Sequence, residues 1–382
     1  MSIGAILSGL LSDKFGRKGV IVITCCLFSI FTILCGFASS VTELSIYRFI
    51  TGVGLGAAMP NISTIVSEYM PARRKAFLTG LAGCGFMLGI SCGGLMSAYM
   101  LESMGWSKVI IIGGIIPLLL VVVLVLKMPE STQYLIKNQK TAQAQRILEK
   151  IQGAPFAEGT ELVLPKSEIQ GNESPVGLVL GKYLFGSSMM WLCCFMSLLV
   201  FYLLTSWMPV LLKQAGFTTE QYSLIAAIFP FGGVFGTALI GWAMDKFQAN
   251  RALMVVYFIS AVLMVLTGLF TNDIVLFGVI IFLAGAGLVG AQSSLPALTA
   301  LFYPVQGRAA GVSWMHGIGR LGAIFGAFFG AQIFALNLSL SQIFMLLGIP
   351  VLVSALALWV KGKDKSIQNN NSVSVSSVIP KN

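Results

Sequence analysis

The chain has 382 residues, of which 56% are hydrophobic and only 10% are charged, and its formal net charge is +10. Soluble domains have about 25% charged residues, so this composition excludes an ordinary soluble protein and indicates a polytopic membrane protein. The basic residues fall in short loops between apolar segments, a distribution that argues against nucleic-acid binding. All seven cysteines lie in apolar stretches without C-x-x-C spacing, so neither a disulfide framework nor a zinc site is expected.

Long apolar runs predict ten membrane-spanning helices in chain order. They cover residues 19–39, 44–69, 75–101, 106–128, 185–212, 221–243, 252–271, 274–301, 309–336 and 338–360. Residues 1–12 are also apolar, but at 1.5 Å per residue they would cover only about 18 Å of a roughly 30 Å hydrocarbon core. We therefore expect them to form an eleventh, incomplete span.

The charges of the loops predict the orientation of these spans, because Lys and Arg favour the cytoplasmic side of a membrane. The basic residues of alternate loops and of the C-terminal tail would all face one side, while Lys108 and Lys213 would face the other. Arg48 and Arg320 belong to neither side, because both lie inside predicted spans. We expect a multi-pass protein of the bacterial inner membrane.

The spans divide the chain into four parts. Residues 1–128 form an N-terminal helical bundle, and residues 185–361 form a C-terminal bundle of six helices. Residues 129–184 are a cytoplasmic linker with an amphipathic helix, and residues 362–382 are a disordered cytoplasmic tail. Neither the linker nor the tail contains a catalytic constellation, so we expect no enzymatic activity and no cofactor.

Two phrases of the first half recur in the second half at nearly the same separation. Gly9 to Phe15 (GLLSDKF) returns as Gly241 to Phe247 (GWAMDKF). Tyr69 to Arg74 (YMPARR) corresponds to Tyr303 to Arg308 (YPVQGR) in the second half. A shared offset indicates a duplicated bundle, which is how secondary transporters are built, with two halves that rock around a site between them.

The stretch from Gly9 to Lys18, GLLSDKFGRK, resembles the cytoplasmic signature between helices 2 and 3 of the major facilitator superfamily. The resemblance implies an all-α membrane protein with the two-bundle major facilitator fold, here lacking helix 1 and part of helix 2. It also implies that a charge network locks the inner gate. The gating residues assigned in this way are Asp13, Arg17, Glu68, Asp245 and Arg308. An ordinary basic loop is the alternative.

Two further segments resemble helices 4, 10 and 11 of the aromatic acid:proton symporters within that superfamily. The first contains RFITGVGLG from Arg48, Pro60-Asn61 and EYMPARR from Glu68, and the second contains Gly290-Ala291-Gln292 and GVSWMHGIGRLG from Gly311. The resemblance implies proton-coupled uptake of an aromatic carboxylate, such as a benzoate or hydroxybenzoate, by alternating access. A monomer in the lipid bilayer is expected, with the solute and protons as its small partners.

Arg320 is the leading candidate to bind the carboxylate. It lies roughly 16 Å from the cytoplasmic end of its span, too deep to reach the interface easily. Gly317, Gly319 and Gly322 are expected to open room beside it, and a guanidinium matches a carboxylate through two hydrogen bonds. A structural ion pair is the alternative. Arg48 lies near the outer end of its span, where the resemblance assigns it to proton coupling and extension to the interface is the alternative.

The other candidate binding residues are less distinctive. His316 lies four residues before Arg320, on the same helical face, and could line the site or carry a proton. Phe229 could form the wall for an aromatic ring, with Tyr202 and Trp207 on the preceding span. Gln292 and Asn61 belong to the resembling segments and complete the set.

Two other functions stay open at this point. One is a transporter of a sugar or a nonaromatic organic acid, which competition between benzoates and sugars during uptake would distinguish. The other is a truncated fragment or membrane sensor that does not transport.

Overall fold

The computed structural model describes residues 4, 8, 11–12, 14–69, 75–152, 175–181, 183–271, 273–336 and 338–363. Every regular element in these ranges is a helix, so the predicted all-α class is confirmed. Asp13, residues 70–74, the linker over 153–174 and the tail from residue 364 lie outside the described residues, as does most of the predicted incomplete span over 1–12.

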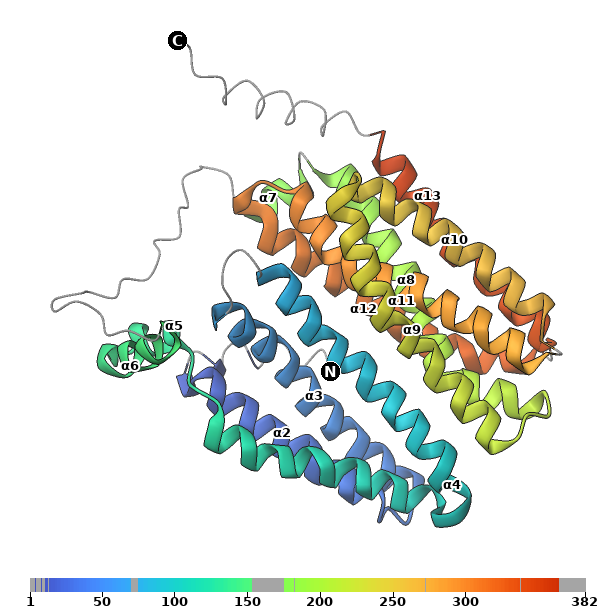
Figure 1. Cartoon of the computed structure of the whole chain (residues 1–382), viewed down its shortest axis with the longest axis horizontal. Coiled ribbons are helices and arrows are strands. Elements are labelled where there is room, and N and C mark those ends of the chain that lie inside the picture. Colours follow the sequence, from blue (N-terminus) through green and yellow to red (C-terminus); the bar gives the residue numbers. More distant parts are fainter. Residues whose placement is uncertain are drawn as a thin grey trace, which may run out of the picture. The chain divides into compact units, whose positions relative to one another are not determined.

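Long helices dominate the structure (Figure 1). They are α2 (Arg17–Cys35), α3 (Val41–Tyr69), α4 (Lys75–Lys127), α8 (Leu184–Gln214), α9 (Thr219–Lys246), α10 (Ala249–Leu269), α11 (Ile274–Phe302), α12 (Val305–Ala335) and α13 (Leu340–Lys361). Two predicted spans fall within α4, where Gly105 has a non-helical backbone (φ 77°, ψ 163°) that separates two helical segments. Each predicted span therefore corresponds to one helix or to one segment of α4.

Most of these helices can cross a membrane. Within the described ranges, eight helices have the length and apolar composition that a span requires. The helix α12 is not among the eight, although it has 31 residues, and it contains His316 and Arg320. Helices suit this environment because they satisfy their own backbone hydrogen bonds where no water is present.

The start of the linker differs from the single amphipathic helix that the sequence predicted. It forms two short helices, α5 (Thr132–Lys137) and α6 (Thr141–Gln152), and a third, α7 (Pro175–Leu180), precedes α8. The break follows from Gln139, whose φ of 58° lies in the left-handed region and cannot continue a right-handed helix. The hydroxyl of Ser131 begins α5 by accepting a hydrogen bond from the backbone N–H of Tyr134 at 3.2 Å.

The chain packs as two compact units. The first comprises Met1–Ala82 and Tyr99–Glu168, and the second comprises Gly83–Ala98 and Ile169–Asn382. The first has its core around Ile21 and Ile65, while aromatic side chains such as Phe229 and Tyr257 fill the second. The predicted boundaries at residues 128, 184 and 361 stay predictions.

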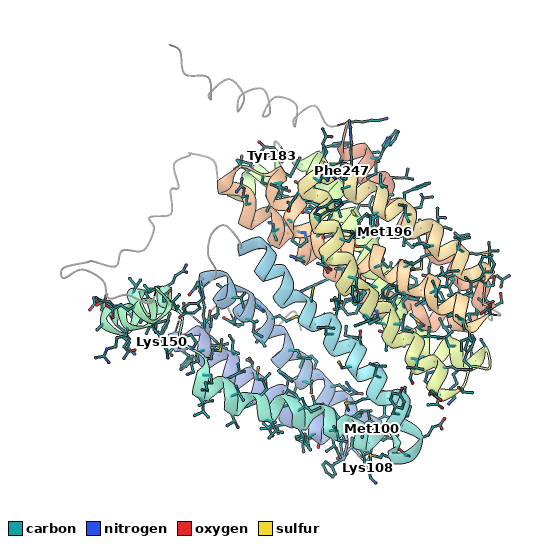
Figure 2. The ribbon with its side chains drawn as sticks, in the orientation of Figure 1. Met100, Lys108, Lys150, Tyr183, Met196 and Phe247 are labelled. Carbon is teal, nitrogen blue, oxygen red and sulfur yellow. The ribbon has the colours of Figure 1, made fainter. Side chains whose placement is uncertain are left out.

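The ends of the first unit agree with the orientation expected from the loop charges. Figure 2 shows Met100 and Lys108 at one end of this unit and Lys150, on α6, at the other. Lys108 and Lys150 were expected on opposite sides of the membrane, so the end with α5 and α6 corresponds to the cytoplasmic one.

Candidate functional site

The loop of the first duplicated phrase folds against Glu130. Gly16 precedes α2 with φ 81° and ψ 157°, and a Cβ at this position would collide with the carboxylate of Glu130. The same carboxylate accepts hydrogen bonds from the backbone N–H groups of Lys18 at 3.0 Å and Ser131 at 2.9 Å. A negative charge here satisfies a free N–H in the first turn of α2 and interacts favourably with the helix dipole. Glycine is therefore favoured at position 16 by its positive φ, and a side chain here would have to displace the Glu130 carboxylate.

A buried charge pair lies beside this cap. The guanidinium of Arg17 forms an ion pair with the carboxylate of Glu68 on α3, and it also donates to Ser131 Oγ at 3.4 Å and Gln133 Oε1 at 3.5 Å. The hydroxyl of Ser131 donates to the second oxygen of Glu68 at 2.6 Å. The side chain of Glu68 is 3% exposed and that of Arg17 is 21% exposed. The network therefore ties α2 to α3 and to the start of α5.

The structure brings Arg17 and Glu68 together, but it also includes residues that the sequence reasoning did not assign. Glu130 and Ser131 complete the network, and the hydroxyl of Tyr69 donates to the backbone carbonyl of Glu130. The sequence contained one signal for Glu130 and Ser131. They belong to the motif Pro129-Glu130-Ser131 at the end of a predicted span, in the same expected cytoplasmic region as Arg17. Asp13 belongs to the predicted gate but lies outside the described residues.

The predicted gate residues of the second half do not form the same arrangement. Asp245 is exposed near the end of α9 and forms neither a hydrogen bond nor an ion pair with any described residue. Arg308 is also exposed, and its Nε donates to the backbone carbonyl of Tyr303 at 3.2 Å. No hydrogen bond or ion pair joins Asp245 to Arg308 in this part of the structure.

Other residues hold this end of the second unit. Lys361 is 2% exposed, donates to Asn250 Oδ1 at 3.2 Å, and places its ammonium 4.7 Å from the centre of the Phe302 ring. The Phe302 ring also packs edge-on against Tyr183, with their centres 5.4 Å apart. Figure 2 shows Tyr183 and Phe247 at this same end of the second unit. At this end of the second unit, a buried cation therefore contacts an amide oxygen and an aromatic ring.

Arg320 is the central residue of the 31-residue helix α12, about 22 Å from each end. It is half-buried and forms no hydrogen bond or ion pair with any residue that the structure describes. The guanidinium is close enough to interact electrostatically with Tyr202 of α8 and with His316. An arginine at this depth costs at least about 2.5 kcal/mol unless a partner or water compensates it.

The glycines beside Arg320 have different roles from the one predicted. Of the three, Gly317 alone faces open space. Gly319 and Gly322 pack against Cys194 and Phe195 of α8, where any Cβ would collide with the neighbouring helix. The expectation that all three glycines open room beside Arg320 was wrong for these two, because they permit close helix packing instead.

The other candidate binding residues lie in both units. In the second unit, Gln292 accepts a hydrogen bond from Ser197 and donates to Cys194 Sγ at 3.5 Å, so it lies next to the sulfur that Gly319 contacts. His316 is exposed on α12. Phe229 is fully buried, and its ring centre lies 6.3 Å from that of Phe201. In this conformation Phe229 is therefore a core residue that a solute does not reach.

Asn61 and Arg48 belong to the first unit. Asn61 is 4% exposed and donates to the backbone carbonyl of Ala57 at 2.9 Å. Arg48 is exposed near the start of α3 and has no ion pair with a described residue. Among the described residues, no group of three or more His, Cys, Asp and Glu side chains could hold a metal ion.

Comparison with known proteins adds an independent result. The chain matches the sequence profile described as "Major Facilitator Superfamily" over residues 1–255 and, in a second match, over 190–379. The chain belongs to the Major Facilitator Superfamily. The 4-hydroxybenzoate transporter PcaK of Pseudomonas aeruginosa is 40% identical over 364 residues, which cover 95% of this chain and 81% of the relative. A gallate transporter of Pseudomonas putida is 38% identical over 95% of this chain and 81% of its own length.

A solved structure supports the same fold. The D-xylose-proton symporter has a TM-score of 0.69 and 20% identity, over 94% of this chain and 83% of that one. This major facilitator protein is therefore a multi-pass integral membrane protein, and the bacterial relatives agree with the expected inner membrane. The predicted resemblance to aromatic acid transporters within the superfamily is confirmed by the two relatives.

Proposed function

We propose that this protein is a secondary active transporter for an aromatic carboxylate of the benzoate or hydroxybenzoate type. Relatives named as transporters of 4-hydroxybenzoate and gallate, both aromatic carboxylates, align with 95% of the chain and support this solute class. The structural observation that carries the proposal is the guanidinium of Arg320 at the centre of α12, which has no hydrogen-bond or ion-pair partner among the described residues. A carboxylate would supply the charge partner that no described residue provides.

The chemistry around Arg320 suits such a solute. A guanidinium offers two parallel N–H donors that match the two oxygens of a carboxylate. Tyr202 and His316 add polar groups beside it, and Gln292 lies near the same helix contact. Asn61 would complete the binding residues. Phe229 would contribute to the aromatic wall only if its surroundings rearrange, because it is fully buried here.

Transport would proceed by alternating access, in which cytoplasmic gates open and close while the solute stays bound. Arg17 and Glu68 would form the gate of the first half together with Asp13, and Asp245 and Arg308 would act in the second half. Proton coupling is part of the proposal because the chain resembles the aromatic acid:proton symporters, with Arg48 in the coupling group.

The test is calorimetric titration of the purified protein with 4-hydroxybenzoate. Arg320→Ala should weaken binding at least about 100-fold and Arg320→Lys about 10-fold, since charge-assisted hydrogen bonds contribute roughly 1.5–3 kcal/mol and lysine keeps only the charge. The neutral 4-hydroxybenzamide should bind weakly to every form. Uptake of labelled 4-hydroxybenzoate should be inhibited by benzoate and not by xylose.

Arg308→Lys is the matched control, because it makes the same substitution in an exposed residue of the same helix. The Arg308→Lys variant should bind 4-hydroxybenzoate with the affinity of the original protein. Binding affinity is compared, and not transport rate, because a change in a gate residue can alter the rate. Thermal melts must show that every variant is folded. Unchanged affinity in a folded Arg320→Ala protein would move the carboxylate site elsewhere, with Arg48 as the next candidate.

A further inference from the structure

The outer surface of the second unit has an apolar groove between α10 and α13, two helices that lie side by side (Figure 1). The groove has a volume of about 310 Å³. Its walls are Met254, Val255 and Phe258 from α10 and Leu352, Ala355, Leu356 and Trp359 from α13. Phe258 is 54% exposed and Trp359 is 48% exposed, so the groove opens outward. In a membrane protein this surface contacts lipid chains.

Two basic residues lie at one end of this groove. Arg251 precedes Met254 and Val255 by three and four residues, which places it on the same face of α10. Lys363 follows α13, and its ammonium lies 3.4 Å from the centre of the Trp359 ring. Both side chains are exposed, and neither forms an ion pair with a described residue. The groove therefore ends in two positive charges that lack an acidic partner in this part of the chain.

We propose that this groove is a binding site for one anionic phospholipid, with an acyl chain along the groove and the phosphate at Arg251 and Lys363. The length agrees, because α13 from Leu352 to its end at Lys361 spans about 14 Å, roughly half of a 30 Å hydrocarbon core and thus one leaflet. The end with Arg251 and Lys363 is the cytoplasmic one by loop charge, and anionic lipids are attracted to basic clusters there. Trp359, between the charges and the apolar walls, suits the interface between headgroups and chains.

Trp359 also provides the measurement. Tryptophan fluorescence of the purified full chain in detergent micelles is recorded while brominated phosphatidylglycerol or brominated phosphatidylcholine is added, and the signal of a Trp359→Phe variant is subtracted. The anionic lipid should quench Trp359 at a mole fraction about 30-fold lower than the zwitterionic lipid, because each of the two basic residues contributes about 1 kcal/mol to anionic lipid binding. Arg251→Gln combined with Lys363→Gln should abolish this preference.

The control Lys140→Gln with Lys150→Gln removes two exposed lysines from the linker region and should leave the preference unchanged. Val255→Phe, at a 47% exposed position, should narrow the groove and reduce quenching by both lipids. Equal quenching by the two lipids, or equal loss of preference in the linker control, would overturn the proposal. Complete reversal of quenching by millimolar inorganic phosphate would also overturn it, by showing that the basic pair holds a free anion in place of a lipid.

Discussion

The corresponding ends of the two halves use different chemistry at equivalent positions. Glu68 directly precedes the tyrosine of its duplicated phrase in the first half, and Phe302 directly precedes the matching tyrosine in the second. Lys18 and Asn250 likewise hold the same position relative to Asp13 and Asp245, the aspartates of the other phrase. In the first half the acid at position 68 pairs with Arg17, whereas in the second half the ring at position 302 lies beneath the Lys361 ammonium.

This difference shows that duplication preserved the placement of the phrases without preserving their partners. The first unit joins its helices through an acid-base pair, which is strong only while both charges are present. In the second unit, Lys361 contacts the amide of Asn250 and the aromatic face of Phe302. Equal roles for Asp13 and Asp245 therefore do not follow from the repeated sequence alone. The difference between the two ends can be tested by replacing one residue of the polar contacts in each unit.

The largest effect is expected for Glu68→Ala. This change removes a 3% exposed carboxylate that pairs with Arg17 and accepts a hydrogen bond from Ser131, which should lower the free energy of unfolding by about 3 kcal/mol. Unfolding can be followed with a thiol-reactive dye, because Cys193 and Cys194 are 0% exposed in the folded protein and become accessible when it unfolds. The exposed Cys92 is first replaced by serine so that it does not react with the dye in the folded state.

Two controls sharpen this first prediction. Glu102→Ala removes another glutamate of the first unit, at an exposed position in α4, and should shift the melting temperature far less. Arg17→Ala combined with Glu68→Ala should lower the free energy of unfolding by less than the sum of the two single changes, because the ion pair is lost only once. Additive losses would show that Arg17 and Glu68 do not act as a pair.

A smaller loss is expected for Asn250→Leu in the second unit. Asn250 accepts from Lys361 and donates to the backbone carbonyl of Leu358 at 2.9 Å, so leucine would remove both hydrogen bonds and lower stability by about 1–2 kcal/mol. The same thiol-dye melt measures this loss of stability. Asn138→Leu is the control, because it makes the same substitution at an exposed asparagine that follows α5. A loss as large as that of Glu68→Ala would contradict the distinction between the two ends.

The smallest effects should come from the paired tyrosines. Tyr69→Phe removes the hydrogen bond to the Glu130 carbonyl, and Tyr303→Phe removes the one shared with Ser187 at 2.5 Å. Each should cost about 1 kcal/mol, since each loses one neutral hydrogen bond. Tyr222→Phe, at a hydroxyl that bonds to no described residue, should leave the melt unchanged. Unequal losses for Tyr69 and Tyr303 would show that even this shared residue has diverged between the halves.

Much of the architecture was predictable because lipid imposes simple rules on sequence. Apolar runs of sufficient length must be helices, and loops rich in Lys and Arg stay on one side, so the spans and their order could be derived before any contact was known. Arg320 was recognisable as unusual for the same reason, since a charge in a long apolar segment is costly wherever its neighbours lie.

The contacts of the polar residues depended on the tertiary structure. Nothing in the local sequence indicates that the Glu130 carboxylate lies against Gly16, or that Gly319 and Gly322 pack on α8 while Gly317 does not. Phe229 looked like a wall for a solute, and only its burial against Phe201 showed it to be a core residue here. Local sequence determines which segments enter the membrane, whereas the partner of each buried charge or glycine comes from a distant segment that only folding brings within reach.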